Sequence, residues 1–94
     1  MYFTYILQSE SSGRFYIGST GDLERRVTQH NAPDYTGSKT TKRFQGPWKL
    51  VYSEPFSSRS QAVIREREIK AWKSNKAVQR LISAQLAESR FSRD

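Results

Sequence analysis

The stretch FYIGSTGDLERRVTQH, residues 15–30, predicts a strand, a turn rich in Gly, Ser and Thr, and then a short helix. Arg26 and His30 follow Leu23 by three and seven residues, so the three side chains share one face of that helix. Arg25 lies on the opposite face. Charged side chains are seldom buried unless they are paired or have a function. Arg26 and His30 are therefore candidates for a functional site.

The residues on either side supply two further strands and two further helices. Alternating aromatic and β-branched residues predict strands over residues 2–8 and 48–54, and the first of these forms a hairpin with residues 15–19. In the last strand Trp48, Leu50 and Tyr52 are expected on one face. Gly18 marks a position where a side chain would obstruct a close approach by backbone or substrate.

Two helices are predicted in the C-terminal half. A capping box at Ser58 opens a helix that ends near Lys73, with Ala62, Ile69 and Trp72 on its apolar face. A last helix is expected over residues 76–88. The element order predicts an α+β fold, with three strands and about three helices in a single domain over residues 1–88. Residues 89–94 are expected to form a frayed tail.

The charge of the chain indicates a polyanionic partner. Lys and Arg outnumber Asp and Glu by 16 to 9 in 94 residues, which gives a net charge of +7. We favour a nucleic-acid partner over the alternative that the charge only keeps the protein soluble. The loop over residues 31–47 carries Lys39, Lys42 and Arg43 among hydroxyl and aromatic residues, a mixture that suits a phosphate backbone. A solvated loop whose aromatic residues cover the edge of the core is the alternative.

Several classes of protein are excluded by composition. The chain has no Cys and one His, so a thiol nucleophile, a disulfide framework and a cysteine or multi-histidine zinc site are ruled out. A metal would need oxygen ligands, which favours Mg²⁺ or Mn²⁺. No apolar run is long enough to span a membrane, and we expect a cytoplasmic protein.

Glu66 is the second charged residue on an apolar helix face. It lies four residues after Ala62 and three before Ile69, whereas Glu68 points elsewhere. An inward Glu66 could pair with an inward Arg26 in a semi-buried salt bridge. It could instead bind a metal ion while Arg26 binds a phosphate. The spacing alone does not decide between the two.

Several motifs, in this order, resemble the GIY-YIG nuclease superfamily. They are Phe3-Thr4-Tyr5, Tyr16-Ile17-Gly18, Arg26, His30 and Glu66, within the stretches TYIL, FYIGST-DLERR, KLVYSE and RE--IKAW. The chain is most similar to the small single-domain bacterial members related to the N-terminal domain of the excision-repair nuclease UvrC. The resemblance covers about residues 2–82, with Phe-Thr-Tyr in place of the first Gly-Ile-Tyr.

The resemblance implies metal-dependent hydrolysis of phosphodiester bonds in DNA, single- or double-stranded, with low sequence specificity. Its implied site residues are Tyr5, Tyr16, Arg26, His30 and Glu66, with Glu66 as ligand of one Mg²⁺ or Mn²⁺ ion. We take Tyr5 as the general base and Tyr16 as the residue that positions the water or the phosphate, although the roles could be exchanged. A base of this kind needs a pKa lowered from about 10. The resemblance also suggests Lys39 and Asn75 as further residues of the site.

Two other functions are compatible with these residues. A nucleic-acid-binding module could have kept the fold and lost the chemistry. A basic adaptor could bind a protein partner through Trp72 and the last helix. Because every residue that the chemistry requires has a candidate in the chain, the nuclease is preferred.

Overall fold

A computed structural model describes residues 1–32 and 46–91 of the chain. Its elements are β1 (Tyr2–Ser9), β2 (Phe15–Thr20), α1 (Leu23–Asn31), β3 (Trp48–Phe56), α3 (Arg59–Trp72) and α4 (Asn75–Phe91). The predicted α+β class is confirmed, and α4 continues past its expected end at residue 88. Within the described residues, no helix is long and apolar enough to cross a membrane.

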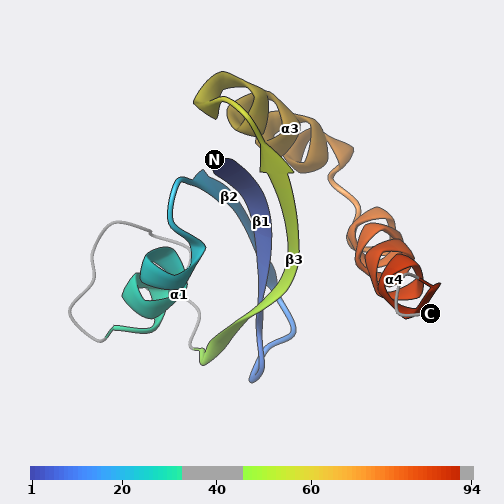
Figure 1. Cartoon of the computed structure of the whole chain (residues 1–94). Helices are drawn as coiled ribbons and strands as arrows, with labels where there is room; N and C mark the ends of the chain where they lie inside the picture. Colours follow the sequence, from blue (N-terminus) through green and yellow to red (C-terminus); the bar gives the residue numbers. More distant parts are fainter. Residues whose placement is uncertain (33–45, 92–94) are drawn as a thin grey trace.

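The three strands form one antiparallel sheet in the order β2-β1-β3, with β1 in the centre. The N-terminal strand is therefore bonded on both edges: Tyr5 lies opposite Gly18 of β2 and Ser53 of β3. Figure 1 shows α1 on one side of the sheet, α3 across the end of the sheet that holds the N-terminus, and α4 on the other side, next to β3. Helices thus surround a sheet that is too small to bury its own faces.

Alternate residues of β1 enter two separate cores. Ile6 packs with Tyr52 of β3, Ile69 of α3 and Val78 of α4. Tyr5 and Leu7 point the other way, where Trp48 and residues of α1 cover them. Because successive side chains of a strand alternate between the faces of a sheet, one central strand anchors both layers.

Strand β3 departs from the regular alternation predicted for it. Tyr52 pairs with Ile6, but Leu50 pairs with Leu7, so Val51 is an extra residue and the ladder is irregular between Ile6 and Leu7. Trp48 and Tyr52 consequently lie in different cores, and Leu50 is exposed. The expectation that these three side chains share one face was wrong because a β-bulge shifts the period of the strand.

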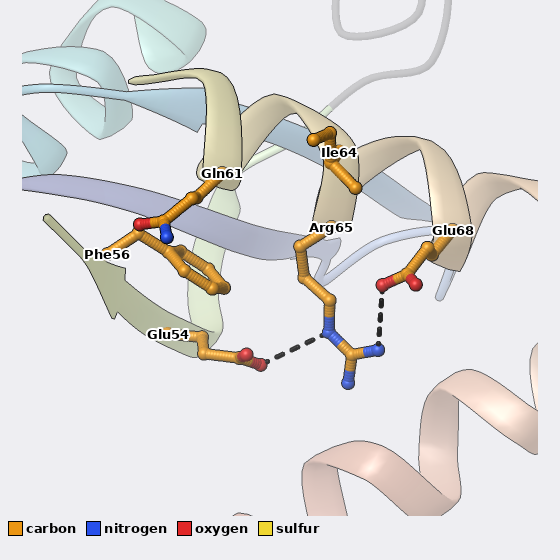
Figure 2. A pocket seen from close by; sticks show the side chains of 6 residues that line it. All are labelled: Glu54, Phe56, Gln61, Ile64, Arg65 and Glu68. Carbon is orange, nitrogen blue, oxygen red and sulfur yellow. Dashed lines mark hydrogen bonds and ion pairs between the residues drawn. The ribbon is translucent and has the colours of Figure 1, made fainter. Parts of the chain in front are cut away.

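Helix α3 is held in one rotational position about its axis. On its inner side the hydroxyl of Thr4 donates a buried hydrogen bond of 2.7 Å to the carbonyl of Ala62. On its outer side Arg65 bonds the carboxylates of Glu54, at 3.3 Å, and Glu68, at 3.4 Å (Figure 2). Trp72, expected on the apolar face, is instead exposed, with its ring 5.6 Å from the Arg65 guanidinium.

Helix α1 is fixed at both ends. The Asp22 side chain caps its start by accepting from the backbone N–H of Arg25 at 3.1 Å. At its end the Asn31 amide accepts from the N–H of Trp48 at 2.7 Å and donates to the Trp48 carbonyl at 2.8 Å. These bonds fix the face of α1 that is turned toward the sheet.

Candidate active site

Three aromatic side chains predicted for the site meet beneath α1. The Tyr5 hydroxyl lies 3.1 Å from Nε2 of His30, and the Tyr16 ring centroid is 4.6 Å from that of His30. Tyr5 is 0% exposed and His30 is 5% exposed, whereas Tyr16 is half-buried. The sheet pairs the strands that carry the two tyrosines, and α1 places His30 against both rings. The structure thus brings together three residues that are up to 25 positions apart.

Gly18 allows this arrangement because it lies opposite Tyr5 on the neighbouring strand. A Cβ atom at Gly18 would lie 2.7 Å from the Tyr5 hydroxyl oxygen and 2.8 Å from Cζ. The close approach expected at Gly18 was by backbone or substrate. The approaching group is the side chain of Tyr5 itself, which lies across the Gly18 backbone.

Burial determines the protonation of Tyr5. It raises the pKa of the Tyr5 hydroxyl well above its usual range, and the neighbouring Tyr16 raises it further. The Arg26 guanidinium acts in the opposite direction and lowers this pKa, but not enough to offset burial. At neutral pH the Tyr5 hydroxyl therefore keeps its proton, and the lowered pKa expected for a tyrosinate base is not found in the protein by itself.

His30 is neutral for the same reason. Burial, assisted by the positive charge of Arg26, lowers the pKa of the imidazole to about 4. A neutral imidazole has one nitrogen that accepts a hydrogen bond. In the tautomer whose proton is on Nδ1, Nε2 accepts the hydroxyl proton of Tyr5 at the observed distance.

Arg26 lies on the inner face of α1, as the spacing predicted. It is half-buried while Arg25 is exposed, and Nη1 of Arg26 donates to the Gln29 side chain at 3.3 Å. Its charge influences the pKa of both Tyr5 and His30. The guanidinium is therefore part of the aromatic cluster and not a remote surface charge.

Glu66 approaches the cluster from α3. Its side chain is 18% exposed, against 57% for Glu68, so the prediction of which carboxylate turns inward is confirmed. Its negative charge contributes to the raised pKa of Tyr5. The ion pair observed for Glu66 is with Lys70, one turn further along the helix, at 2.5 Å. Lys70 was not anticipated from the sequence, although its i, i+4 spacing is typical of such pairs.

The donors available for a metal ion are few. Among residues 1–32 and 46–91 no group of three or more His, Cys, Asp or Glu side chains could enclose one. Mg²⁺ is commonly held by one or two carboxylates, with waters and substrate phosphate oxygens completing its coordination. The partly exposed carboxylate of Glu66 fits that role, and a cage made by the protein alone does not.

Four more residues were predicted for the site or for DNA binding. Lys39, Lys42 and Arg43 are outside the described residues. Asn75 is exposed at the first position of α4. Sequence reasoning also passed over Arg59, which precedes Glu66 by seven residues and so shares its helix face. The seven-residue spacing could have indicated that Arg59 lies on the same side of the helix as Glu66.

Comparison with known proteins places the chain in a family. Residues 1–79 match the family model described as the GIY-YIG catalytic domain, so the chain belongs to the GIY-YIG family, and the resemblance is confirmed. Within that family it is similar to proteins named UPF0213. One, from Halobacterium salinarum, is 43% identical over 70 residues, which cover 74% of this chain and 86% of the relative.

Two other matches bear on fold and function. The solution NMR structure of a UPF0213 protein from Bacillus halodurans is 34% identical, with a TM-score of 0.53, and the match covers 89% of this chain and 85% of that one. A protein from Meyerozyma guilliermondii named structure-specific endonuclease subunit SLX1 is 52% identical over 52 residues. Those residues make up 53% of this chain and 18% of the relative. Family membership and this relative support a nuclease function.

Proposed function

We propose that the protein is a divalent-metal-dependent nuclease that hydrolyses phosphodiester bonds in DNA with little sequence preference. The observation that carries this proposal is the convergence of Tyr5, His30, Arg26 and Glu66 from three different elements on one partly buried cluster. Membership of the GIY-YIG family and the name of the SLX1 relative support the same chemistry.

The first step requires a group that removes a proton from the attacking water. Tyr5 is a poor source of free tyrosinate, because burial raises its pKa. Its contact with His30 offers another route: the hydroxyl oxygen accepts a proton from water as the hydroxyl proton moves to Nε2. His30 is neutral at pH 7 and takes that proton only transiently, because its pKa of about 4 makes the imidazole a weak base. Tyr5 then relays the proton without becoming a stable anion.

Charge that develops on the phosphoryl oxygens needs stabilisation. Arg26 provides a rigid fork of N–H donors suited to two oxygens of one phosphate. Glu66 would hold one Mg²⁺ or Mn²⁺ ion, which when bound supplies further charge neutralisation at the phosphate. Lys70 would release the Glu66 carboxylate to that ion. Tyr16, half-buried beside His30, would orient the water or the phosphate.

One observation favours a second candidate, a nucleic-acid-binding module without catalysis. Tyr5 is completely buried, so its hydroxyl reaches solvent only if neighbouring groups move. A relic site of this kind would keep the basic surface and the fold. The two candidates differ in whether a strand is cut.

The decisive experiment is cleavage of labelled single-stranded and duplex DNA with Mg²⁺, with Mn²⁺ and with a chelator. Glu66→Gln should abolish cleavage and leave DNA binding intact or improved, since it removes a negative charge beside the phosphate. Glu68→Gln is the matched control and should cleave like the parent, because Glu68 is exposed on the outer side of α3. Tight binding without cleavage by the parent protein in every metal would establish the second candidate instead.

A further inference from the structure

A pocket of about 370 Å³ lies next to the site and is lined by residues of β1, the end of β2, α1 and the start of α3. Four parts of the chain line it, through Tyr2, Ser19, Thr20, Gly21, Arg26 and Arg59. Its charged residues are two arginines, and its lining contains no carboxylate. A concave surface with this composition attracts an anion.

Arg26 connects this pocket to the site. It forms part of the pocket wall and also perturbs the pKa of Tyr5 and His30. On the α3 side, Arg59 and Glu66 share one face but are seven residues apart, about 10 Å along the helix axis. One phosphate bound at Glu66 would therefore be distant from Arg59. The next phosphate of the same strand is the group that Arg59 can reach.

The position of Arg59 is well defined. The buried bond from Thr4 to the Ala62 carbonyl anchors the first turn of α3 on the sheet. Ser58 caps that turn by accepting from the N–H of Gln61 at 3.3 Å. Arg59, the first residue of the helix, is exposed at the pocket and forms no ion pair with a residue in the described part of the chain. Arg59 thus lines a pocket whose wall holds no carboxylate to neutralise it.

The remaining wall suits a nucleotide. The Thr20 hydroxyl accepts from the N–H of Asp22 at 3.1 Å, which fixes the turn that carries Ser19 and Thr20 into the pocket. The Tyr2 ring lies over this turn, since a Cβ atom at Gly21 would be 3.3 Å from its Cε1 atom. Hydroxyls contact phosphate oxygens, and exposed aromatic rings stack on bases.

The groove drawn in Figure 2, on another side of α3, differs in charge from the pocket at Arg59. It is lined by Arg65, but the guanidinium is bonded to both Glu54 and Glu68. Two carboxylates outweigh one arginine, so this groove repels an anion. Of the two surfaces beside α3, the one at Arg59 has the charge that a nucleic acid requires.

We propose that this pocket is a second phosphate subsite. In it Arg59 and the Ser19 hydroxyl hold the phosphate next to the scissile one, and Tyr2 stacks on the adjoining base. The subsite would select substrates that continue for at least one nucleotide beyond the cut. This inference rests on the proposed function for the identity of the strand, but the binding of that strand is measurable without cleavage.

The test uses Arg59→Ala in the full chain, with Arg80→Ala as the matched control. Arg80 is an exposed arginine on α4, so its loss removes the same charge from a distant surface. Binding of a fluorescent single-stranded oligonucleotide is measured in chelator over a range of salt. Arg59→Ala should weaken binding by on the order of tenfold and reduce the slope of log K against log salt by about one. Arg80→Ala should change neither.

The phosphate itself is identified with oligonucleotides that carry a single neutral methylphosphonate at successive linkages. The parent should bind more weakly when the neutral linkage is the one that occupies the subsite. At that linkage the substitution should not change the affinity of Arg59→Ala. At other linkages both proteins should lose the same affinity. Equal losses for both proteins at every linkage, or an unchanged salt slope, would overturn the assignment. If the parent cleaves no substrate, the proposed nuclease function is refuted. The binding measurements then still test whether the pocket binds a phosphate.

Discussion

The burial of His30 makes the stability of the protein sensitive to mild acid. Its pKa is lowered from 6.5 to about 4 in the fold, while the unfolded chain keeps the ordinary value. Between these values the unfolded state binds the proton more readily, so acidification favours unfolding. The contribution of neutral, buried His30 to the free energy of unfolding is complete above pH 6.5. It is lost progressively as the pH falls to 4.

The size of the effect follows from that difference. The two values differ by 6.5 − 4 = 2.5 pH units, and one unit corresponds to about 1.36 kcal/mol. At pH 5, where the folded imidazole is still mostly neutral, the loss in the free energy of unfolding is about 2 kcal/mol. Placing His30⁺ in the last turn of α1 would recover about 0.3–1 kcal/mol through the helix dipole, so burial prevails.

The assay is thermal unfolding followed by circular dichroism at pH 7.5, 6.5, 5.5 and 5.0. Because His30 is the only histidine in the chain, and carboxyl groups mostly titrate at lower pH, His30 dominates the change between pH 6.5 and 5.0. A loss of about 2 kcal/mol lowers the Tm by roughly 10 °C in a domain of this size. His30→Gln retains an acceptor for Tyr5 but cannot be protonated, so its Tm should stay nearly constant. A flat parent curve, or an equal fall in His30→Gln, would refute the reasoning.

Two further predictions concern residues beside this histidine. Gly18→Ala should cost about 1–3 kcal/mol, because its methyl group would overlap the buried ring of Tyr5; Gly21→Ala, whose methyl group meets only an exposed ring, should melt within a few degrees of the parent. Arg26→Ala should slow single-turnover cleavage by on the order of a hundredfold with a Tm close to the parent's, and Arg25→Ala should alter neither. A large fall in Tm for Arg26→Ala, with cleavage per folded molecule preserved, would assign Arg26 a structural role.

Local pattern was sufficient for the order of the elements. The alternation over residues 2–8, the capping residue Ser58 and the helical spacing after Leu23 each depend on a few neighbouring residues, and the structure confirms a strand or a helix at each. The same spacing distinguished Arg26 from Arg25 and Glu66 from Glu68, because the face of a helix is determined by its 3.6-residue period. These features are properties of short segments and need no knowledge of the fold.

Contacts between distant segments had to come from the tertiary structure. The bulge at Val51, which separates Trp48 from Tyr52, arises from the register of β3 on β1. The contact of Tyr5 with His30, and the burial that raises the pKa of Tyr5 and lowers that of His30, depend on how α1 packs against the sheet. The pocket at Arg59 exists because α3 is anchored on β1, close to the turn that follows β2. The sequence alone predicted which residues belong to the candidate site and which way each helix turns them. The fold decided how deeply they are buried and which of them meet, because desolvation and long-range packing depend on the whole chain.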